Sequence, residues 1–250
     1  MARTTDGTSS HYILRTTAIS GLAGGATATM SVWLYRASSG TTSHCGTAEG
    51  TTNGLGFEHW SDNNIYSFAR NGAAGFDTTD STIVSSGWHH YVLVYDGTQS
   101  ALDRLDVYYD GVKQTMNHTG DDHGATMGSM ESMGWGHDTS TGSARYTAGS
   151  YAETAWYDDV LTPAEIASLA SGVTPVLIRP RALVHYWPLV DTTQDVVGGE
   201  EPTLTGTTVL AHPRVINPTA QILQFPPPAA PAGGNEPLFY HHQRMLSRCS

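Results

Sequence analysis

The chain has 250 residues, of which 39% are hydrophobic and 14% are charged, a length that fits one large all-β domain or a domain with an appendage. Twelve basic residues against 23 acidic ones give a net charge of −11, and Lys113 is the single lysine, which excludes nucleic acids and anionic membranes as partners. No apolar run approaches the roughly 18 residues of a membrane span, we expect no secretory signal after Met1, and Cys45 and Cys249 indicate neither a disulfide framework nor a paired-cysteine metal site.

Short strand-like segments alternate with turns through the first 160 residues. Strands are predicted at 12–19, 29–36, 55–60, 65–70, 81–85, 88–95, 105–109, 112–115 and 144–157. The strongest local signal is Asp110-Gly111, which separates two of these segments and is typical of a two-residue β-hairpin turn. Regularly spaced short strands favour an all-β, two-sheet antiparallel sandwich.

Two tryptophans stand beside polar, turn-forming residues, as a sugar-binding platform would. A sugar presents an apolar CH face and a hydroxyl rim, so its site needs an exposed aromatic ring beside planar hydrogen-bonding groups. The candidate carbohydrate-binding residues are Trp60 with Asp62, Asn63 and Asn64, and Trp135 with His137 and Asp138. By contrast, Trp33, Trp88 and Trp156 lie in apolar strands, and we expect them in the core.

The strongest metal candidate is the segment from His118 to His123, where nitrogen and oxygen ligands are closely spaced around a glycine. Asp121 and Asp122 are the candidate carboxylate ligands. Two adjacent aspartates cannot both point inward without strain, so a solvated acidic loop is the competing interpretation.

The sequence lacks the carboxylate pattern of a glycosidase. A retaining glycosidase needs two carboxyl groups about 5–5.5 Å apart, which on a strand requires acids that share a face. Glu153 and Asp158 are five positions apart and point to opposite faces, and Asp110, which shares a face with Asp106, belongs to a turn. We therefore expect no catalytic residues and no enzymatic activity.

One helix is predicted from Thr162 to Ser171. Thr162 is an N-cap residue, Pro163 occupies the first helical position and Glu165 completes a capping box. Gly172 supplies the left-handed stop, so the helix has about two and a half turns.

Composition changes after Gly172. All 12 prolines lie at or after Pro163, and the 18 acidic and 7 basic residues before Gly172 account for the whole net charge. We expect a body at 1–172 and, at 173–250, a Pro-rich extended arm with no sheet or helix of its own, ordered only when docked on a partner or a sister subunit. A disordered tail is the alternative. The apolar residues proposed to dock are Leu183, Tyr186, Trp187, Leu189, Leu238, Phe239 and Tyr240.

Three stretches of the body resemble the laminin-G-like, or concanavalin-A-like, jelly-roll domains. They are 29–34 with its tryptophan, 87–97 followed by 105–112 with their W-H-H and Y-x-D-G patterns, and 152–166 with the last body strand and the helix. The resemblance covers roughly 12–172 and implies a concanavalin-A-like two-sheet antiparallel jelly-roll sandwich with one short helix. It also implies calcium at a rim, for which Asp121 or Asp122 would be the ligand.

The continuation at 172–189 and 211–215 is similar to the C-terminal extension on laminin-G-like proteins of tailed bacteriophages. This resemblance implies a virion structural protein, a capsid decoration or fibre-like surface component, that joins other virion proteins and its own copies and contacts host glycans. The alternative is a carbohydrate-binding module of a bacterial surface or extracellular protein, and a glycosidase is the third hypothesis.

Overall fold

Antiparallel strands are the main regular structure in the part of the chain that the computed structural model describes, namely residues 2–16, 19–38, 41–47, 53–72, 76–80, 82–83, 86–120, 122–130, 132–138, 145–190, 193–213 and 215. All of them belong to the first of two units, Met1–Ile216. Within these residues no helix has the length and apolar character needed to cross a membrane.

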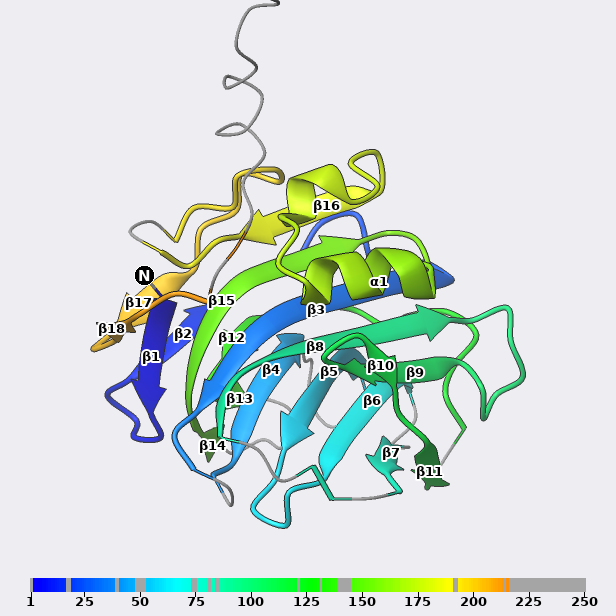
Figure 1. Cartoon of the computed structure of the whole chain (residues 1–250). Helices are drawn as coiled ribbons and strands as arrows, with labels where there is room; N and C mark the ends of the chain where they lie inside the picture. The colour runs from blue at the N-terminus through cyan, green and yellow to red at the C-terminus, as the bar shows by residue number, and fades with distance from the viewer. Residues whose placement is uncertain are drawn as a thin grey trace, which may run out of the picture. The chain divides into compact units, whose positions relative to one another are not determined.

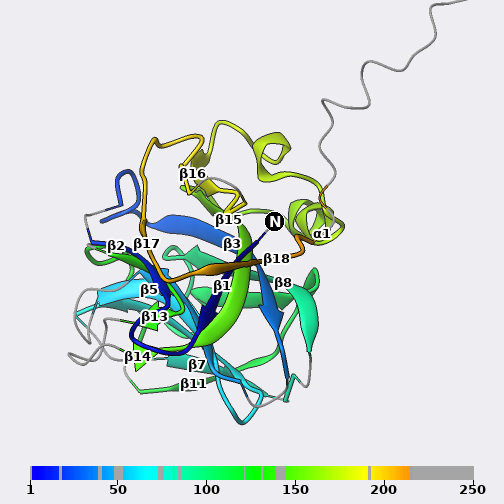
Figure 2. The same ribbon diagram turned by 90° about the vertical axis from the view of Figure 1, so that its left-hand side faces the viewer.

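Two eight-stranded sheets face each other among the described residues (Figures 1 and 2). Sheet A has the order β10 (Val112–Lys113), β9 (Leu105–Tyr109), β8 (Gly87–Asp96), β3 (Thr27–Arg36), β15 (Ala148–Tyr157), β1 (Ala2–Asp6) and β18 (Thr208–Leu210), and β16 (Leu183–Trp187) also pairs with β15. Sheet B has the order β11 (Met116–Thr119), β7 (Phe76–Thr79), β6 (Ile65–Asn71), β5 (Asn53–His59), β4 (Ser43–Thr47), β12 (Met133–Trp135), β2 (Tyr12–Arg15) and β17 (Thr203–Thr205). A short ribbon joins β13 (His137–Asp138) to β14 (Arg145–Tyr146). The predicted two-sheet jelly-roll sandwich is confirmed.

The main core lies between the two sheets. Alternation along β3 sends Met30, Val32 and Leu34 inward, where they are fully buried. Across the gap, Phe57 of β5 stacks on Tyr91 of β8 with ring centroids 5.1 Å apart. The inward faces of the two sheets therefore form one continuous hydrophobic layer.

A second core covers the outer face of sheet A. In Figure 1 the helix α1 (Pro163–Ala170) lies across the long strands β15, β3 and β8. The chain then turns through a short 3-10 helix, η1 (Pro175–Leu177), before β16. The buried residues of this layer are Val92, Val94, Tyr108, Ala155, Tyr157, Leu161, Ile166, Leu169, Ile178, Ala182, Leu183 and Tyr186. Among the described residues, sheet A is thus packed on both faces, whereas the hydrophobic core covers one face of sheet B.

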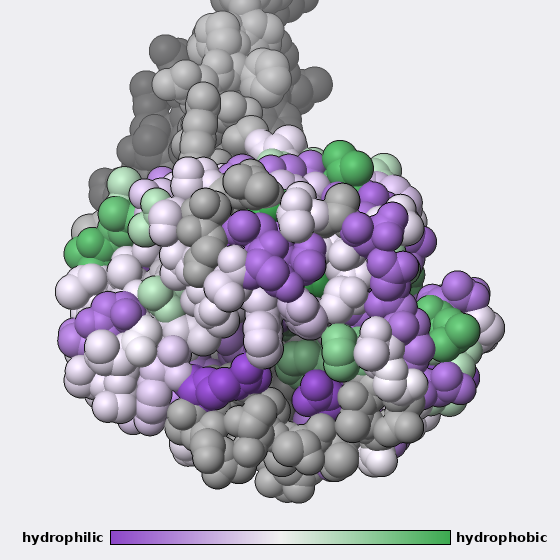
Figure 3. Space-filling view, turned by 90° about the horizontal axis from the view of Figure 1, so that it is seen from below, coloured by the Kyte–Doolittle hydropathy of each residue, from purple (hydrophilic) through white to green (hydrophobic). Residues whose placement is uncertain are grey.

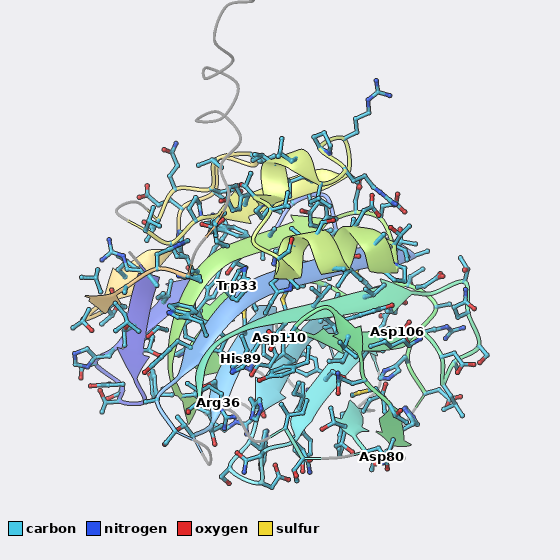
Figure 4. All side chains as sticks on the ribbon, in the orientation of Figure 1. Trp33, Arg36, Asp80, His89, Asp106 and Asp110 are labelled. Carbon is cyan, nitrogen blue, oxygen red and sulfur yellow. The ribbon has the colours of Figure 1, made fainter. Side chains whose placement is uncertain are left out.

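Local sequence signals predict the hairpin and the helix correctly. Asp110 and Gly111 have φ values of 48° and 80°, as a tight hairpin turn between β9 and β10 requires. Figure 4 shows His89 beside Asp110, whose two carboxylate oxygens bind the His89 ring and the His90 backbone N–H. The helix begins after Thr162 with the expected capping box.

Two other expectations about the body are wrong. No strand is found at the described residues of the 81–85 segment, because the strand that pairs with β6 is β7, and Ile83 reaches the core from a loop. Trp156 is fully buried as expected, but Trp33 and Trp88 are half-buried on the outer face of sheet A. Trp33 and Trp88 alternate with the residues of β3 and β8 that face the core. The apolar residues that suggested a core position are therefore their neighbours, which point to the other face of the sheet.

The segment after Gly172 differs most from expectation. We expected it to be ordered only on a partner or a sister subunit, but β16, β17 and β18 pair with β15, β2 and β1 of the same chain (Figure 2). Proline does not prevent this because each described proline stands outside a strand: Pro188 follows β16 directly, Pro202 precedes β17 and Pro213 lies beyond β18. Through residue 213 the segment completes both sheets.

Candidate functional site

A groove lined by aromatic rings lies on the outer face of sheet B, which no helix of the described residues covers. Its lining residues are Glu58, Trp60, Tyr66, Phe68, Arg70, Phe76 and Arg145, around a hollow of about 210 Å³. The turn between β5 and β6, which carries Trp60, lies at the lower edge of Figure 1, and Figure 3 shows that side hollowed between hydrophilic residues. We call this feature the aromatic groove.

Strand alternation explains why these side chains share a face. Because Phe57 faces the core, its neighbour Glu58 points outward, and Glu58 lies opposite Tyr66 of β6. Tyr66 in turn lies opposite Thr78 of β7, which places Phe76, two residues earlier, on the same side. Three consecutive strands therefore supply one polar and aromatic surface.

The rings of three residues form a row along the groove. Trp60 and Tyr66 have centroids 5.1 Å apart, and Tyr66 and Phe76 have centroids 5.8 Å apart. Beside this row, the guanidinium of Arg70 lies 4.5 Å from the centre of the Phe68 ring. Gly56 lies opposite Phe68, and a Cβ at this position would come within 3.0 Å of the Phe68 ring. Because Gly56 has no side chain, the base of the groove beside this ring stays open.

Glu58 holds the groove together electrostatically. Its side chain is buried, it accepts a hydrogen bond from Nε1 of Trp60, and its Oε1 lies 2.5 Å from Nη2 of Arg145 and 3.5 Å from Nδ1 of His44. Arg145 also lies over the Trp60 ring, 5.5 Å from its centre. Trp60 nevertheless stays 37% exposed, so a ring fixed by a buried carboxylate is still accessible to a ligand.

A second hollow of about 320 Å³ adjoins the first. Thr42, Tyr146 and Thr147 line it, and it shares Trp60 and Arg145 with the aromatic groove. Trp60 therefore stands between two depressions, and a ligand that extends through both of them can contact either side of its ring.

The turn that follows Trp60 orders the rim. Asp62 accepts hydrogen bonds from the backbone N–H of Asn64, at 2.9 Å, and from the hydroxyl of Tyr66, at 2.8 Å. Desolvation acts to raise the pKa of Asp62, but these hydrogen bonds outweigh it and hold that pKa below its usual value. The hydrogen bond to Asp62 raises the pKa of Tyr66. Asn63, with φ of 65°, makes the left-handed step of the turn.

The structure places one of the two predicted sugar-binding clusters at the groove. Trp60 lines it, and Asp62, Asn63 and Asn64 form the adjoining turn. Trp135 is fully buried, because on β12 it faces the core, where its Nε1 donates to Thr154 Oγ1. Its expected role as an exposed stacking ring is therefore wrong.

The polar neighbours of Trp135 do not reach the groove as a cluster. His137 is buried, and its ring contacts those of Tyr12 and Tyr146. Asp138 ends β13, and its side chain lies outside the described residues.

Sequence reasoning missed Glu58, Tyr66, Phe68, Arg70, Phe76 and Arg145. Alternation in 65–70 is a signal that could have found three of them, because Tyr66, Phe68 and Arg70 share one face there. No local pattern pairs Glu58 with Arg145, which is 87 residues away.

The predicted calcium ligands do not form a described site. Asp121 lies outside the described residues, and the side chain of Asp122 is exposed. His118 and His123, which bracket them, both contact Asp77 of β7.

Four of the residues proposed to dock on a partner are buried within their own chain. Leu183, Tyr186, Trp187 and Leu189 are at most 7% exposed. Trp187 packs edge-on against Trp135 with centroids 5.3 Å apart, and its Nε1 donates to the Glu200 carbonyl. The docking role of these four is therefore wrong, because the apolar cluster that suggested it fills the chain's own core. Leu238, Phe239 and Tyr240 lie outside the described residues.

Glu153, the acid considered for a glycosidase strand, lies on the other sheet under the second core. It occupies an irregularity of β15, with φ of 53°. Its Oε1 lies 2.9 Å from Nε2 of His212, and its Oε2 accepts from the Tyr186 hydroxyl. The adjoining depression, as the described residues define it, has no space for a water molecule.

The fold is similar to two solved structures over most of the described chain. A native heptameric SAP-like pentraxin from Limulus polyphemus matches with a TM-score of 0.55 and 16% identity, over 82% of this chain and 95% of the pentraxin. A protein from Bacteroides ovatus that is described as carbohydrate-binding matches with a TM-score of 0.59 and 14% identity, over 83% of this chain and 59% of the other.

A match over most of the sequence shows the family of the chain. No curated protein sequence matches the chain. The profile of the concanavalin A-like lectin/glucanases superfamily matches residues 6–167, which hold the aromatic groove and both sheets' central strands. Because this match spans more than half of the chain, the protein belongs to the concanavalin A-like lectin/glucanases superfamily.

Proposed function

We propose that this protein is a lectin-like, non-enzymatic domain that binds a glycan in the aromatic groove. The observation that carries the proposal is Trp60, an exposed ring that a buried carboxylate and Arg145 hold in place. Such a ring can stack on the CH face of a sugar while groups at the groove edge bind the hydroxyl rim. The similar Bacteroides ovatus protein is named for carbohydrate binding, which supports the same class of ligand.

The chemistry of the groove favours binding over hydrolysis. Of the described residues that line the two hollows, Glu58 alone carries a carboxylate, and that carboxylate is engaged by Trp60 and Arg145. Glycoside hydrolysis requires a second carboxyl group across the scissile bond. We therefore propose that bound glycans leave the groove unchanged.

Replacement of Trp60 tests the proposal. On an array of neutral and acidic glycans, the full chain is expected to bind at least one class, with affinity in the weak range of a shallow site. Trp60→Ala is expected to weaken that binding by at least about tenfold, because it removes the stacking ring. Binding by titration calorimetry gives the ratio, and reducing-end analysis of the recovered glycan should show no cleavage.

Trp88→Ala is the matched control for this test. Trp88 is also a partly exposed tryptophan, but it lies on sheet A, where its Nε1 donates to the Ala211 carbonyl. Its replacement should leave glycan affinity unchanged. Equal affinity in Trp60→Ala and the unsubstituted chain, or absence of any glycan ligand, contradicts the proposal.

A finer proposal concerns where the protein acts. The similarity of 172–189 and 211–215 to extensions on jelly-roll proteins of tailed bacteriophages supports a virion structural protein that presents the groove to host glycans. The alternative is a carbohydrate-binding module of a bacterial surface or extracellular protein. Leu238, Phe239 and Tyr240 are proposed to dock on other virion proteins or on a second copy of the chain.

A chain ending at Ile216 tests the docking role, because it keeps every described strand. It is expected to retain glycan binding and the thermal midpoint of the full chain, while it loses association with itself or with purified particles. Light scattering and co-sedimentation report these two kinds of association. Undiminished assembly of the shortened chain would remove the docking role and leave the glycan proposal intact.

A further inference from the structure

Three potential metal ligands meet at the end of sheet B formed by β7 and β11. Asp77 lies directly opposite His118 in the register of these strands, and Nδ1 of His118 is 2.7 Å from Asp77 Oδ1. His123, four residues beyond the end of β11, places its Nε2 3.2 Å from Asp77 Oδ2. One ligand atom from each residue lies within 4.8 Å of the others. Antiparallel pairing therefore brings together groups from two strands and a loop.

The hydrogen bonds of His123 leave a buried lone pair facing a carboxylate. Nδ1 of His123 lies 3.1 Å from the Ala69 carbonyl, which can only accept, so Nδ1 carries the ring hydrogen. In the neutral ring, Nε2 then presents a lone pair to Asp77 Oδ2, and both atoms are buried with His123 0% exposed. Two acceptors in such contact repel each other unless a proton or a metal ion lies between them.

The second histidine has the same unused capacity. Among the described residues, Nε2 of His118 is buried without a hydrogen-bond partner, and its ring stands nearly perpendicular to that of His123, with centroids 5.0 Å apart. The His118 side chain is 17% exposed, so this side of the cluster is open to solvent. A ligating histidine commonly donates its other N–H to a backbone carbonyl, as His123 does here.

We propose that Asp77, His118 and His123 bind a divalent transition-metal ion of the zinc type. Zinc takes imidazole nitrogen and carboxylate oxygen at about 2.0–2.2 Å in tetrahedral geometry, so its ligand atoms stand about 3.3 Å apart. The three ligand atoms, one from each residue, already lie within 4.8 Å of one another and reach that arrangement with small side-chain movements. A water molecule would fill the fourth position from the open side. Calcium is a poor match because it takes six to eight oxygen ligands.

The proposed ion would fasten the edge of the groove-bearing sheet. Among the described strands, β11 is the terminal one of sheet B and pairs with β7 alone, and β7 carries Phe76 of the aromatic groove next to Asp77. Coordination from both strands and from the loop after β11 would add a crosslink that unfolding must break. Zinc binding should therefore raise the thermal midpoint of the whole domain.

Calorimetry and thermal unfolding of the full chain after EDTA treatment and dialysis test the proposal. Zinc is expected to bind one to one at this site with a Kd at or below about 10 µM, and a hundredfold excess of zinc over Kd should raise the thermal midpoint by about 5 °C. Calcium and magnesium should give no shift. His118→Gln and His123→Gln should each weaken zinc binding about 100-fold.

His89→Gln is the matched control. Nδ1 of His89 is 2.7 Å from Asp110 Oδ2, the same separation as in the His118–Asp77 pair. Its replacement should leave zinc affinity unchanged. His241, His242 and Cys249 offer other ligands near the C-terminus, so His241→Ala/His242→Ala is measured as well.

Each other outcome overturns the proposal. It fails if zinc does not bind, if binding persists in both His118→Gln and His123→Gln, if it disappears in His241→Ala/His242→Ala, or if calcium alone stabilises the chain. Should circular dichroism show that the two site variants are unfolded, cobalt bound to the unsubstituted chain decides. We expect the visible absorption of tetrahedral cobalt and no thiolate charge-transfer band. A spectrum without the tetrahedral absorption rejects the site.

Discussion

Replacing Asp195 with alanine is expected to lower the free energy of unfolding by about 3–5 kcal/mol, because it leaves a buried charge without its partner. Asp195 and His185 are at most 1% exposed, and Oδ2 of Asp195 lies 2.7 Å from Nδ1 of His185. Oδ1 of Asp195 also accepts the backbone N–H groups of Tyr186, Val197 and Gly198. The alanine variant therefore strands several buried donors together with the imidazole.

Urea unfolding at pH 6.0 measures this loss. Asp106→Ala is the control, because Asp106 also forms an ion pair of 2.7 Å, with Lys113, but on the surface of sheet A (Figure 4). Surface pairs contribute about 0–1 kcal/mol, so the control should be nearly neutral. A loss in Asp195→Ala no greater than that in Asp106→Ala would show that the 183–200 segment contributes little to the stability of the sandwich.

Acidification from pH 6.5 to 4.5 is expected to lower the free energy of unfolding by about 3–5 kcal/mol, through two buried histidines. Burial lowers the pKa of His90 to about 3, and burial followed by the Arg36 charge lowers that of His59 to about 3. Arg36 Nη1 donates to His59 Nε2 at 2.9 Å, which leaves no place for a second ring proton. Both rings accept protons readily only after unfolding.

The sign follows from which state binds more protons. Between the unfolded pKa of about 6.5 and the folded value of about 3, the unfolded chain binds more protons, so stability falls by about 1.4 kcal/mol per pH unit for each histidine. Burial acts to lower the pKa of His185, but its bonds to Asp195 and Ser20 raise that pKa overall. The stability that His185 contributes is therefore fully present below pH 6.5 and does not change over this range. Carboxylates whose pKa is lowered lose their contribution only below about pH 4.5.

Urea unfolding at pH 6.5, 5.5 and 4.5, with EDTA present throughout, measures the slope. His90→Gln should flatten it by about half even though it also loses the 2.8 Å bond between His90 Nε2 and Ser31 Oγ. Stability that does not change with pH in this range would contradict the buried, neutral state of His59 and His90.

Local sequence patterns were sufficient for the elements whose stability is local. The Asp110-Gly111 turn and the Thr162 cap act within a few residues, and both appear in the structure where they were predicted. Trp60 was found for the same reason, since the polar turn that follows it also sets its exposure. The remainder of the groove depends on pairing between β5, β6 and β7 and on an arginine from β14, which only the assembled sheet specifies.

Trp135 shows how a local pattern misled the prediction. Gly134 and Gly136 suggested an exposed turn, but packing requires both of them. A Cβ on Gly134 would lie 1.9 Å from the His137 carbonyl oxygen, and Gly136, with φ of 69°, would bring a Cβ within 2.4 Å of Thr5 Oγ1. Glycine here marks a close approach of chain segments, which has the same sequence signature as a turn.

The pairing of the first strands with the last ones has a consequence for folding kinetics. Arg3 of β1 is held between Tyr151 of β15 and Val209 of β18, partners roughly 150 and 200 residues further along, and β2 is bordered by β12 and β17. Closing such long loops precedes any gain from the contacts, so the sandwich forms late and slowly, after the chain has been synthesised beyond residue 210. Until then β1 and β2 each present an unpaired edge to neighbouring chains. A fragment that stops at Gly172 would keep those edges permanently, together with the unfilled space left by Trp187, and would aggregate rather than persist as a folded monomer.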